Sequence, residues 1–164
     1  MSPAPRANCF DASALVKVFT LEPGSDVVSE YFNQRSPTKY TTPFCFYETL
    51  SVLKVKWLYR KELTQAEYSE AAFRLTAWFG AATRHAKDID FQDPLVFSKV
   101  RDIEKRYSLD WSDAFQIMSV KDGYFSHLVN DSRTILVTAD ENLAKAARAE
   151  GIKCWYVIGE PEPL

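Results

Sequence analysis

Short, almost continuous apolar runs alternate with amphipathic segments along most of the chain. Four runs are rich in β-branched and aromatic residues and predict buried strands, over residues 6–10, 39–42, 134–138 and 153–157. Helical periodicity predicts helices between and after them, over residues 13–21, 25–33, 43–61, 64–78, 94–107, 108–120 and 141–150. Strands and helices therefore alternate at both ends of the chain, with a run of helices in the middle.

Capping residues support several of these helix boundaries. Ser25 follows a Pro-Gly turn and is a favoured N-cap, while Pro43 suits the first position of a helix. Thr64 and Glu67 have the spacing of a capping box, and Gly151 suits the end of the last helix.

This order of elements predicts an α/β fold. Apolar strands that alternate with helices indicate a central, mainly parallel sheet covered on both faces, which is a three-layer α/β/α sandwich. The length of 164 residues suits one domain, and no linker divides it. We expect a single domain over residues 1–164, with residues 1–6 and 159–164 as tails.

Composition bears on the cellular location of the protein and on the classes of partner it could bind. No apolar run reaches the length of a membrane span, and the first residues lack the layout of a signal peptide, so we expect a cytoplasmic protein without a membrane partner. Three cysteines without metal-ligand spacing predict reduced core thiols, and His85 and His127 match no zinc motif. The net charge of −2 counts mildly against a passive nucleic-acid binder but not against an enzyme with clustered acids.

Two aspartates follow predicted strands. Asp11 comes directly after the first strand, and Asp140 comes after the third with one residue between. The carboxyl ends of parallel strands meet at one edge of the sheet, so we expect both side chains at that edge. The alternative is that each aspartate only caps the helix that follows it.

Two further acids lie within apolar stripes of predicted helices. Glu48 shares a stripe with Cys45, Val52, Val55 and Tyr59. Asp113 shares one with Leu109, Ile117 and Val120, and Asp110 is offset from it as an N-cap or a rim acid. An unpaired charge among apolar residues is costly, which favours a functional role. The alternatives are a surface position for Glu48 and a capping acid for Asp113.

Four carboxylates brought together would repel one another strongly. A hard divalent cation such as Mg²⁺ or Mn²⁺ relieves this repulsion, because such ions prefer oxygen ligands. A carboxylate-held metal can activate water for attack on a phosphodiester. The acids thus predict a metal site for hydrolysis.

Four stretches resemble, in order, the acidic motifs of PIN-domain nucleases, in particular the VapC-type toxins of type II toxin–antitoxin pairs. They are "CFDASALVKVFTLEPGS", "YETLSVL", "LDWSDAFQIMSV" and "ILVTADENLAKAARAEGIK", and the resemblance spans residues 8–157. It implies an α/β/α sandwich with a Mg²⁺- or Mn²⁺-dependent endoribonuclease activity on RNA. It also implies a cognate antitoxin protein and a homodimer. The extra length relative to such toxins lies around residues 71–93.

By position, the resemblance gives catalytic roles to Asp11, Glu48, Asp113 and Asp140. We assign the metal to Asp11, Asp113 and Asp140. The supporting residues are the hydroxyl side chains Ser13 and Thr138 and the neighbouring acids Asp110 and Glu141.

The polar sectors of the predicted helix 43–61 hold Thr49, Ser51, Lys54, Lys56 and Arg60. Lys54, Lys56 and Arg60 are candidates for contacts to RNA phosphates, with a solvated helix face as the alternative. A non-catalytic PIN-like module that binds RNA or protein is an alternative function, as is another carboxylate enzyme. A phosphatase of the Asp-x-Asp type would need an acid where Ser13 stands.

Overall fold

The computed structural model describes residues 6–36, 38–82, 89–90, 92–123, 126 and 134–163. Within these residues one sheet contains four parallel strands in the order β2-β1-β3-β4. The strands are β1 (Ala7–Phe10), β2 (Thr38–Tyr40), β3 (Thr134–Thr138) and β4 (Lys153–Tyr156). In the centre, Cys9 of β1 lies opposite both Tyr40 of β2 and Leu136 of β3. The predicted parallel sheet is confirmed, and the carboxyl ends of its strands share one edge.

The predicted helices are present in the predicted order. Their bounds are α1 (Ala12–Phe19), α2 (Ser25–Glu30), α3 (Pro43–Leu58), α4 (Gln65–Ala82), α5 (Pro94–Tyr107), α6 (Trp111–Asp122) and α7 (Glu141–Ala149). A short π-helical segment, η1 (Tyr31–Arg35), continues α2. The longer middle region expected around residues 71–93 is partly the end of α4. Residues 83–88 and 91, as well as His127, lie outside the described residues.

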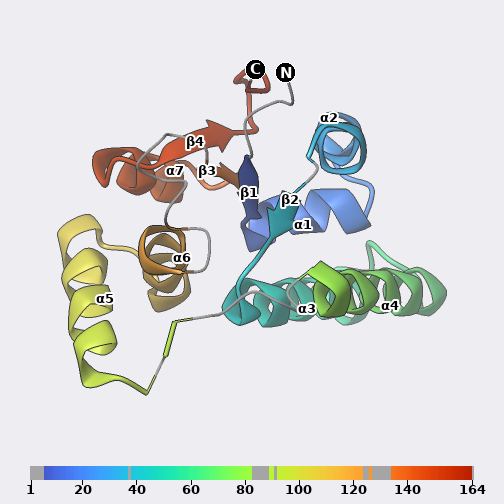
Figure 1. Ribbon diagram of the computed structural model, residues 1–164. Coiled ribbons are helices and arrows are strands. Elements are labelled where there is room, and N and C mark those ends of the chain that lie inside the picture. Colours follow the sequence, from blue (N-terminus) through green and yellow to red (C-terminus); the bar gives the residue numbers. More distant parts are fainter. Residues whose placement is uncertain are drawn as a thin grey trace.

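Helices cover both faces of the sheet, which gives the predicted three layers (Figure 1). Side chains alternate between the faces: Phe10 and Val137 pack with residues of α1, α2, η1, α3 and α4. Cys9 and Leu136 point the other way and pack with residues of α5, α6 and α7. Both faces of the strands are buried, as their continuous apolar sequences predicted.

Several local predictions can be compared with the structure. Thr64 and Glu67 form the reciprocal capping box, with the Thr64 N–H donating to Glu67 Oε2 at 2.7 Å and the Glu67 N–H donating to Thr64 Oγ1 at 3.2 Å. Gly151 follows α7 with a φ of 81°, as a C-terminal cap requires. The N-cap prediction for Ser25 is wrong, because Gly24 occupies that position and the Ser25 hydroxyl instead donates to the Thr20 carbonyl.

The expected polar sector of α3 is wrong at two positions. Thr49 and Lys56 are both buried. The Thr49 hydroxyl donates to the Cys45 carbonyl one turn earlier, at 2.6 Å. The Lys56 ammonium lies 3.0 Å from Glu22 and 2.7 Å from Glu62, and Glu22 also pairs with Lys17 at 3.0 Å. Paired charges of this kind are tolerated where a lone ammonium would not be.

Specific contacts hold the C-terminal segment that was expected to be a tail. Glu160 pairs with Arg148 at 2.6 Å, and its carbonyl accepts from Trp155 Nε1 at 3.2 Å. Glu162 pairs with Arg35 at 2.7 Å. These contacts attach residues 160–162 to both α7 and η1.

All three cysteines are free; Cys9 and Cys45 are buried as expected of core residues, whereas Cys154 is only partly buried. In the described part of the chain, no helix is both long and apolar enough to cross a membrane.

The pairs around Glu22 lead to a stability prediction. Glu22→Gln leaves Lys17 and Lys56 without their shared carboxylate, and we expect a loss of about 2 kcal/mol in the free energy of unfolding. Glu30→Gln is the matched control, because the pair of Glu30 with Arg35 is exposed and contributes about 0–1 kcal/mol. Urea denaturation of both variants measures the difference. Equal stability of the two variants would show that the network around Glu22 is not structural.

Candidate active site

Asp11 occupies the edge of the sheet where β1 passes into α1. Its carboxylate is buried, with 3% of the residue exposed. It makes no capping hydrogen bond to α1. Instead, Oδ2 accepts hydrogen bonds from Ser13 Oγ at 2.7 Å and from Thr138 Oγ1 at 2.9 Å. The capping alternative therefore does not describe how this side chain is used.

The two hydroxyls also bind the turn that follows β3. Ser13 Oγ accepts from the Ala139 N–H and Thr138 Oγ1 accepts from the Asp140 N–H, both at 2.9 Å. Each hydroxyl has one proton, and both protons point to Asp11. The 3.2 Å between the two hydroxyl oxygens is then a close contact. Ser13 and Thr138 thus fasten the β1–α1 turn to the β3–α7 turn, in the supporting role that the resemblance implied.

Asp140 lies in the neighbouring turn, so the two strand-end aspartates share one edge as expected. Its Oδ1 accepts from the Leu143 N–H at 3.1 Å and caps α7. The capping alternative therefore holds for Asp140. Its Oδ2 has no hydrogen-bond partner among the described residues. Glu141 is exposed and pairs with Lys145 of its own helix at 2.9 Å, on the surface.

Asp113 lies half-buried in the first turn of α6. Burial raises the pKa of its carboxyl from 3.8 to about 8, with further contributions from the charges of Asp11 and Asp140 and then of Glu48 and Asp110. This pKa places five carboxyl groups within electrostatic reach of one another. The structure thus brings together the four acids predicted to be catalytic, with Asp110 as the fifth.

Glu48, in the second turn of α3, is exposed, so the expectation that its apolar neighbours bury it is wrong. Tyr59, on the same stripe, is itself largely exposed. The pKa of Glu48 is nevertheless raised, first by partial loss of hydration and then by the charge of Asp11, while a hydrogen bond from Ser112 opposes the shift. Glu48 is therefore an acid at the mouth of the cluster.

Asp110 is exposed at the N-cap position of α6, and its side chain makes no capping hydrogen bond. It therefore holds the N-cap position of the first alternative without the capping hydrogen bond, and its role as a rim acid stays a prediction. It stands outside the hydrogen-bond network that holds Asp11.

A buried polar network that the sequence interpretation missed lies under Asp11. Gln116 is fully buried, and its Oε1 accepts from Thr42 Oγ1 at 2.9 Å and from Cys45 Sγ at 3.1 Å. Its Nε2 contacts Cys9 Sγ at 2.9 Å. The Cys45 thiol also lies 3.5 Å from Asp11 Oδ1. Burial and then the charge of Asp11 raise the pKa of this thiol, so it keeps its proton. Gln116, an amide in the apolar run "AFQIM", was the available signal.

The three basic residues proposed to contact RNA differ in solvent exposure and in ion pairing. Lys54 and Arg60 are exposed. Lys56 is buried and paired with Glu22 and Glu62, which makes it part of the folded framework. Lys54 on α3 and Arg60, two residues after the end of α3, remain as the exposed candidates.

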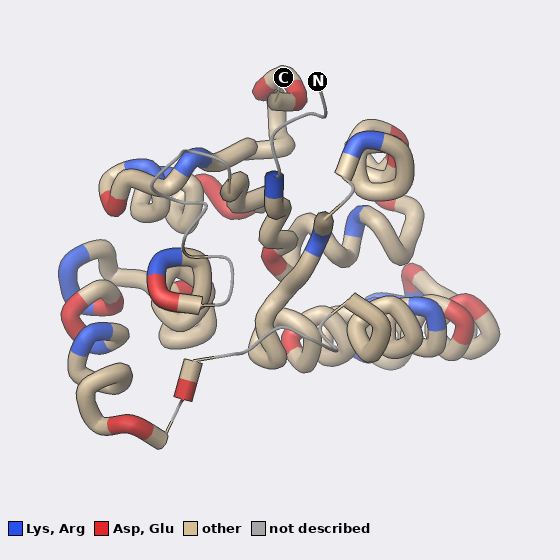
Figure 2. Tube along the Cα trace, in the orientation of Figure 1, with Lys and Arg blue, Asp and Glu red and all other residues tan. Residues whose placement is uncertain are grey.

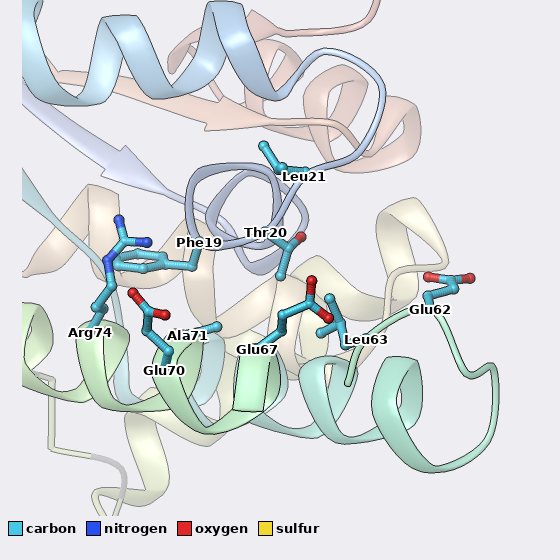
Figure 3. A pocket seen from close by; sticks show the side chains of 9 residues that line it. All are labelled: Phe19, Thr20, Leu21, Glu62, Leu63, Glu67, Glu70, Ala71 and Arg74. Carbon is cyan, nitrogen blue, oxygen red and sulfur yellow. The ribbon is translucent and has the colours of Figure 1, made fainter. Parts of the chain in front are cut away.

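Among the described residues, two surface hollows have linings that include none of the clustered acids. The first, of about 290 Å³, lies between the end of α1 and the start of α4 (Figure 3). Three glutamates line it, Glu62, Glu67 and Glu70, and the Arg74 guanidinium lies 5.6 Å from the centre of the Phe19 ring. The second, of about 450 Å³, lies between α5 and α6.

The chemistry of the acid cluster suits a hard cation, because the donors are carboxylate oxygens, and burial and then the neighbouring negative charges raise the pKa of Asp113. Among the described residues, however, no three His, Cys, Asp or Glu side chains are arranged so that they could hold a metal ion. The carboxylates share one region without forming a ready-made set of ligands.

The raised pKa of Asp113 leads to a prediction about stability and pH. Because the folded pKa of about 8 exceeds the ordinary value of 3.8, the folded protein binds this proton more tightly than the unfolded chain does. The contribution of Asp113 is therefore greatest below pH 3.8 and is lost as pH rises through 8. We expect Asp113→Asn to remove this loss and raise the Tm above pH 8 by about 2–4 °C, the shift that corresponds to about 1 kcal/mol.

Thermal denaturation of both proteins across this pH range, without divalent cations, is the measurement. Asp122→Asn, at the exposed end of the same helix, is the control and should keep the pH dependence of the wild type. An Asp113→Asn curve parallel to that of the wild type would contradict the assignment.

Comparisons with known proteins leave the family open. No protein-family model matches the chain, and no curated protein matches it with significant similarity.

Proposed function

We propose that the protein is a Mg²⁺- or Mn²⁺-dependent endoribonuclease. One observation carries the proposal: Asp11 and Asp140 end neighbouring parallel strands, and their charges, with that of Glu48, act on the half-buried Asp113. The order and spacing of these acids resemble those of PIN-domain nucleases, which supports phosphodiester hydrolysis over other carboxylate chemistry.

The residues take separate roles in this proposal. Asp11, Asp113 and Asp140 would hold the metal, which requires their carboxylates to draw closer together than they lie in this structure, and Glu48 completes the acidic mouth. A bound divalent cation would activate water and offset the charge that develops on the phosphate. Ser13 and Thr138 fix the orientation of the Asp11 carboxylate through the hydrogen bonds to Oδ2. Asp113, with a pKa of about 8, is the acid of the cluster whose charge changes near neutral pH.

The proposal extends to the biological setting that the resemblance suggests. We propose a toxin that acts on RNA in the cytoplasm as a homodimer and is inhibited by a cognate antitoxin. An acidic cluster is a natural binding place for an arginine or lysine of the inhibitor, which would form charge-assisted hydrogen bonds with the carboxylates. Co-purification with the product of a neighbouring reading frame tests the pairing.

Metal dependence is the first prediction of this proposal. Purified protein, free of any partner, should cleave single-stranded RNA in the presence of Mg²⁺ or Mn²⁺ and should stop when a chelator is added. Gel analysis of a labelled RNA measures the cleavage. Full activity in chelator would exclude the metal mechanism, and binding without cleavage under all metal conditions would favour a non-catalytic RNA-binding module.

The second prediction separates the inner acids from the rim. Asp11→Asn and Asp113→Asn should each reduce the cleavage rate by at least about 100-fold, a typical loss for a catalytic carboxylate. Asp110→Asn, a neighbouring acid on the same helix as Asp113, should retain activity within about 10-fold. Circular dichroism should show all three variants folded. A dispensable Asp113 together with an essential Asp110 would reverse the assignment.

A further inference from the structure

The hollow between α5 and α6, here called the α5–α6 hollow, differs in chemistry from the hollow shown in Figure 3. It is lined by Gln92, Pro94, Phe97, Ser98, Arg101 and Trp111. No carboxylate is among these lining residues, whereas three glutamates line the hollow between α1 and α4. The glutamates of the hollow between α1 and α4 would repel a phosphate group. The α5–α6 hollow, without a carboxylate in its lining, would accept one.

Two aromatic rings of the α5–α6 hollow are partly open to solvent. Phe97 is 43% exposed and Trp111 is 44% exposed. Their ring centres are 6.3 Å apart, and each also packs on Phe115, at 5.6 Å and 6.3 Å respectively. Phe115 in turn stacks on Phe44 at 4.6 Å. The exposed rings therefore rest on a packed aromatic base, which limits their movement.

Arg101 supplies the positive charge of the hollow. It lies four residues after Phe97 on α5 and so projects from the same face of that helix. It has no ion-pair or hydrogen-bond partner among the described residues. α5 carries both acidic and basic residues (Figure 2), but among the described residues that line the hollow Arg101 is the only charged one. Its guanidinium is thus available to a ligand.

The α5–α6 hollow includes the start of α6, the element that also positions Asp110 and Asp113. Trp111 is the first residue of α6, directly after Asp110 and two residues before Asp113. All three belong to the same helical turn, which rises only about 5.4 Å. Trp111 and Asp113 are two residues apart and so project from different sides of α6. A strand held in the hollow would bend around the start of α6, at Asp110, to reach the inner acids.

We propose that the α5–α6 hollow binds single-stranded RNA, with an unpaired base stacked on Trp111 and Phe97 and a neighbouring phosphate on Arg101. Unpaired bases stack on aromatic side chains irrespective of sequence, whereas the bases of a duplex are already stacked and paired. The assignment of RNA as the ligand rests on the proposed function. The hollow then selects unpaired strands at the start of α6.

Binding without cleavage tests this proposal. Fluorescence anisotropy is measured in chelator, on the Asp11→Asn background, with labelled oligoadenylate, with labelled oligouridylate and with the duplex of the two. We expect either single strand to bind and the duplex to bind at least about 10-fold more weakly. Trp111→Leu should raise the Kd for single strands about 10-fold, as loss of one stacked base predicts.

Matched variants control for the loss of any exposed aromatic or any exposed arginine. Phe73→Leu removes an exposed ring on α4 and should leave the Kd unchanged. Arg101→Gln should reduce the slope of log K against log salt concentration by about 0.7, the value for one phosphate contact to a single strand. Arg74→Gln, from the glutamate-lined hollow, should leave that slope unchanged.

The outcomes separate this proposal from the proposed function. If the variants weaken binding as described but the wild-type protein cleaves no RNA with any metal, the hollow stands and the nuclease assignment fails. If the wild type cleaves RNA while Trp111→Leu and Arg101→Gln bind and cleave as it does, the hollow proposal is overturned. Equal binding of duplex and single strands, or no binding, also overturns it and leaves the hollow as a surface for a protein partner. Arg101→Gln changes an exposed side chain and so keeps the test valid if Trp111→Leu does not fold.

Discussion

The carboxylate of Asp11 imposes the constraint on which the site depends. A buried carboxylate is costly unless hydrogen bonds replace its hydration. Here two hydroxyls do so, and they come from opposite sides of the β1–β3 pairing. The Asp11 N–H also donates to the Val137 carbonyl at 2.9 Å, which continues the backbone pairing into the turn. The position of Asp140 follows directly, because its N–H is held by the same hydroxyl of Thr138.

Gathering acids at one edge opposes folding, and other parts of the molecule offset this cost. The charge that the cluster suppresses is that of Asp113, which remains protonated to a pH of about 8. Both faces of the sheet bury apolar clusters, and the ion pairs of Glu22 join the end of α1 to the end of α3. Stability and the acidic site are thus supplied by different regions of one fold.

The features of this arrangement that depend on the local sequence of residues could be predicted. Strand and helix sequence, parallel pairing and the shared edge of Asp11 and Asp140 all follow from apolar runs and the residues that end them. Contacts between distant segments were not predictable in the same way. The pairing of Lys56 with Glu22 depends on where the α1–α2 loop passes α3, and helical periodicity carries no information about that.

The same limit explains the errors at the site. Glu48 was placed among apolar neighbours by periodicity, but burial along that stripe is uneven: Cys45 is buried, whereas Glu48 is exposed. Gln116 contacts Thr42 and Cys45, which are more than 70 residues away, and only the folded chain brings these polar atoms together. A polar residue inside an apolar run signals such a network but does not name its partners.

The bridging hydroxyls restrict which sequences can occupy this fold. At positions 13 and 138, one atom must donate to a carboxylate and accept from a backbone N–H at the same time. Serine and threonine meet this requirement, whereas alanine and valine offer no polar atom and asparagine divides donor and acceptor between two atoms. Exchange between serine and threonine should therefore be the main substitution accepted during evolutionary drift. The two positions would vary within this pair even where the surrounding helices diverge beyond alignment.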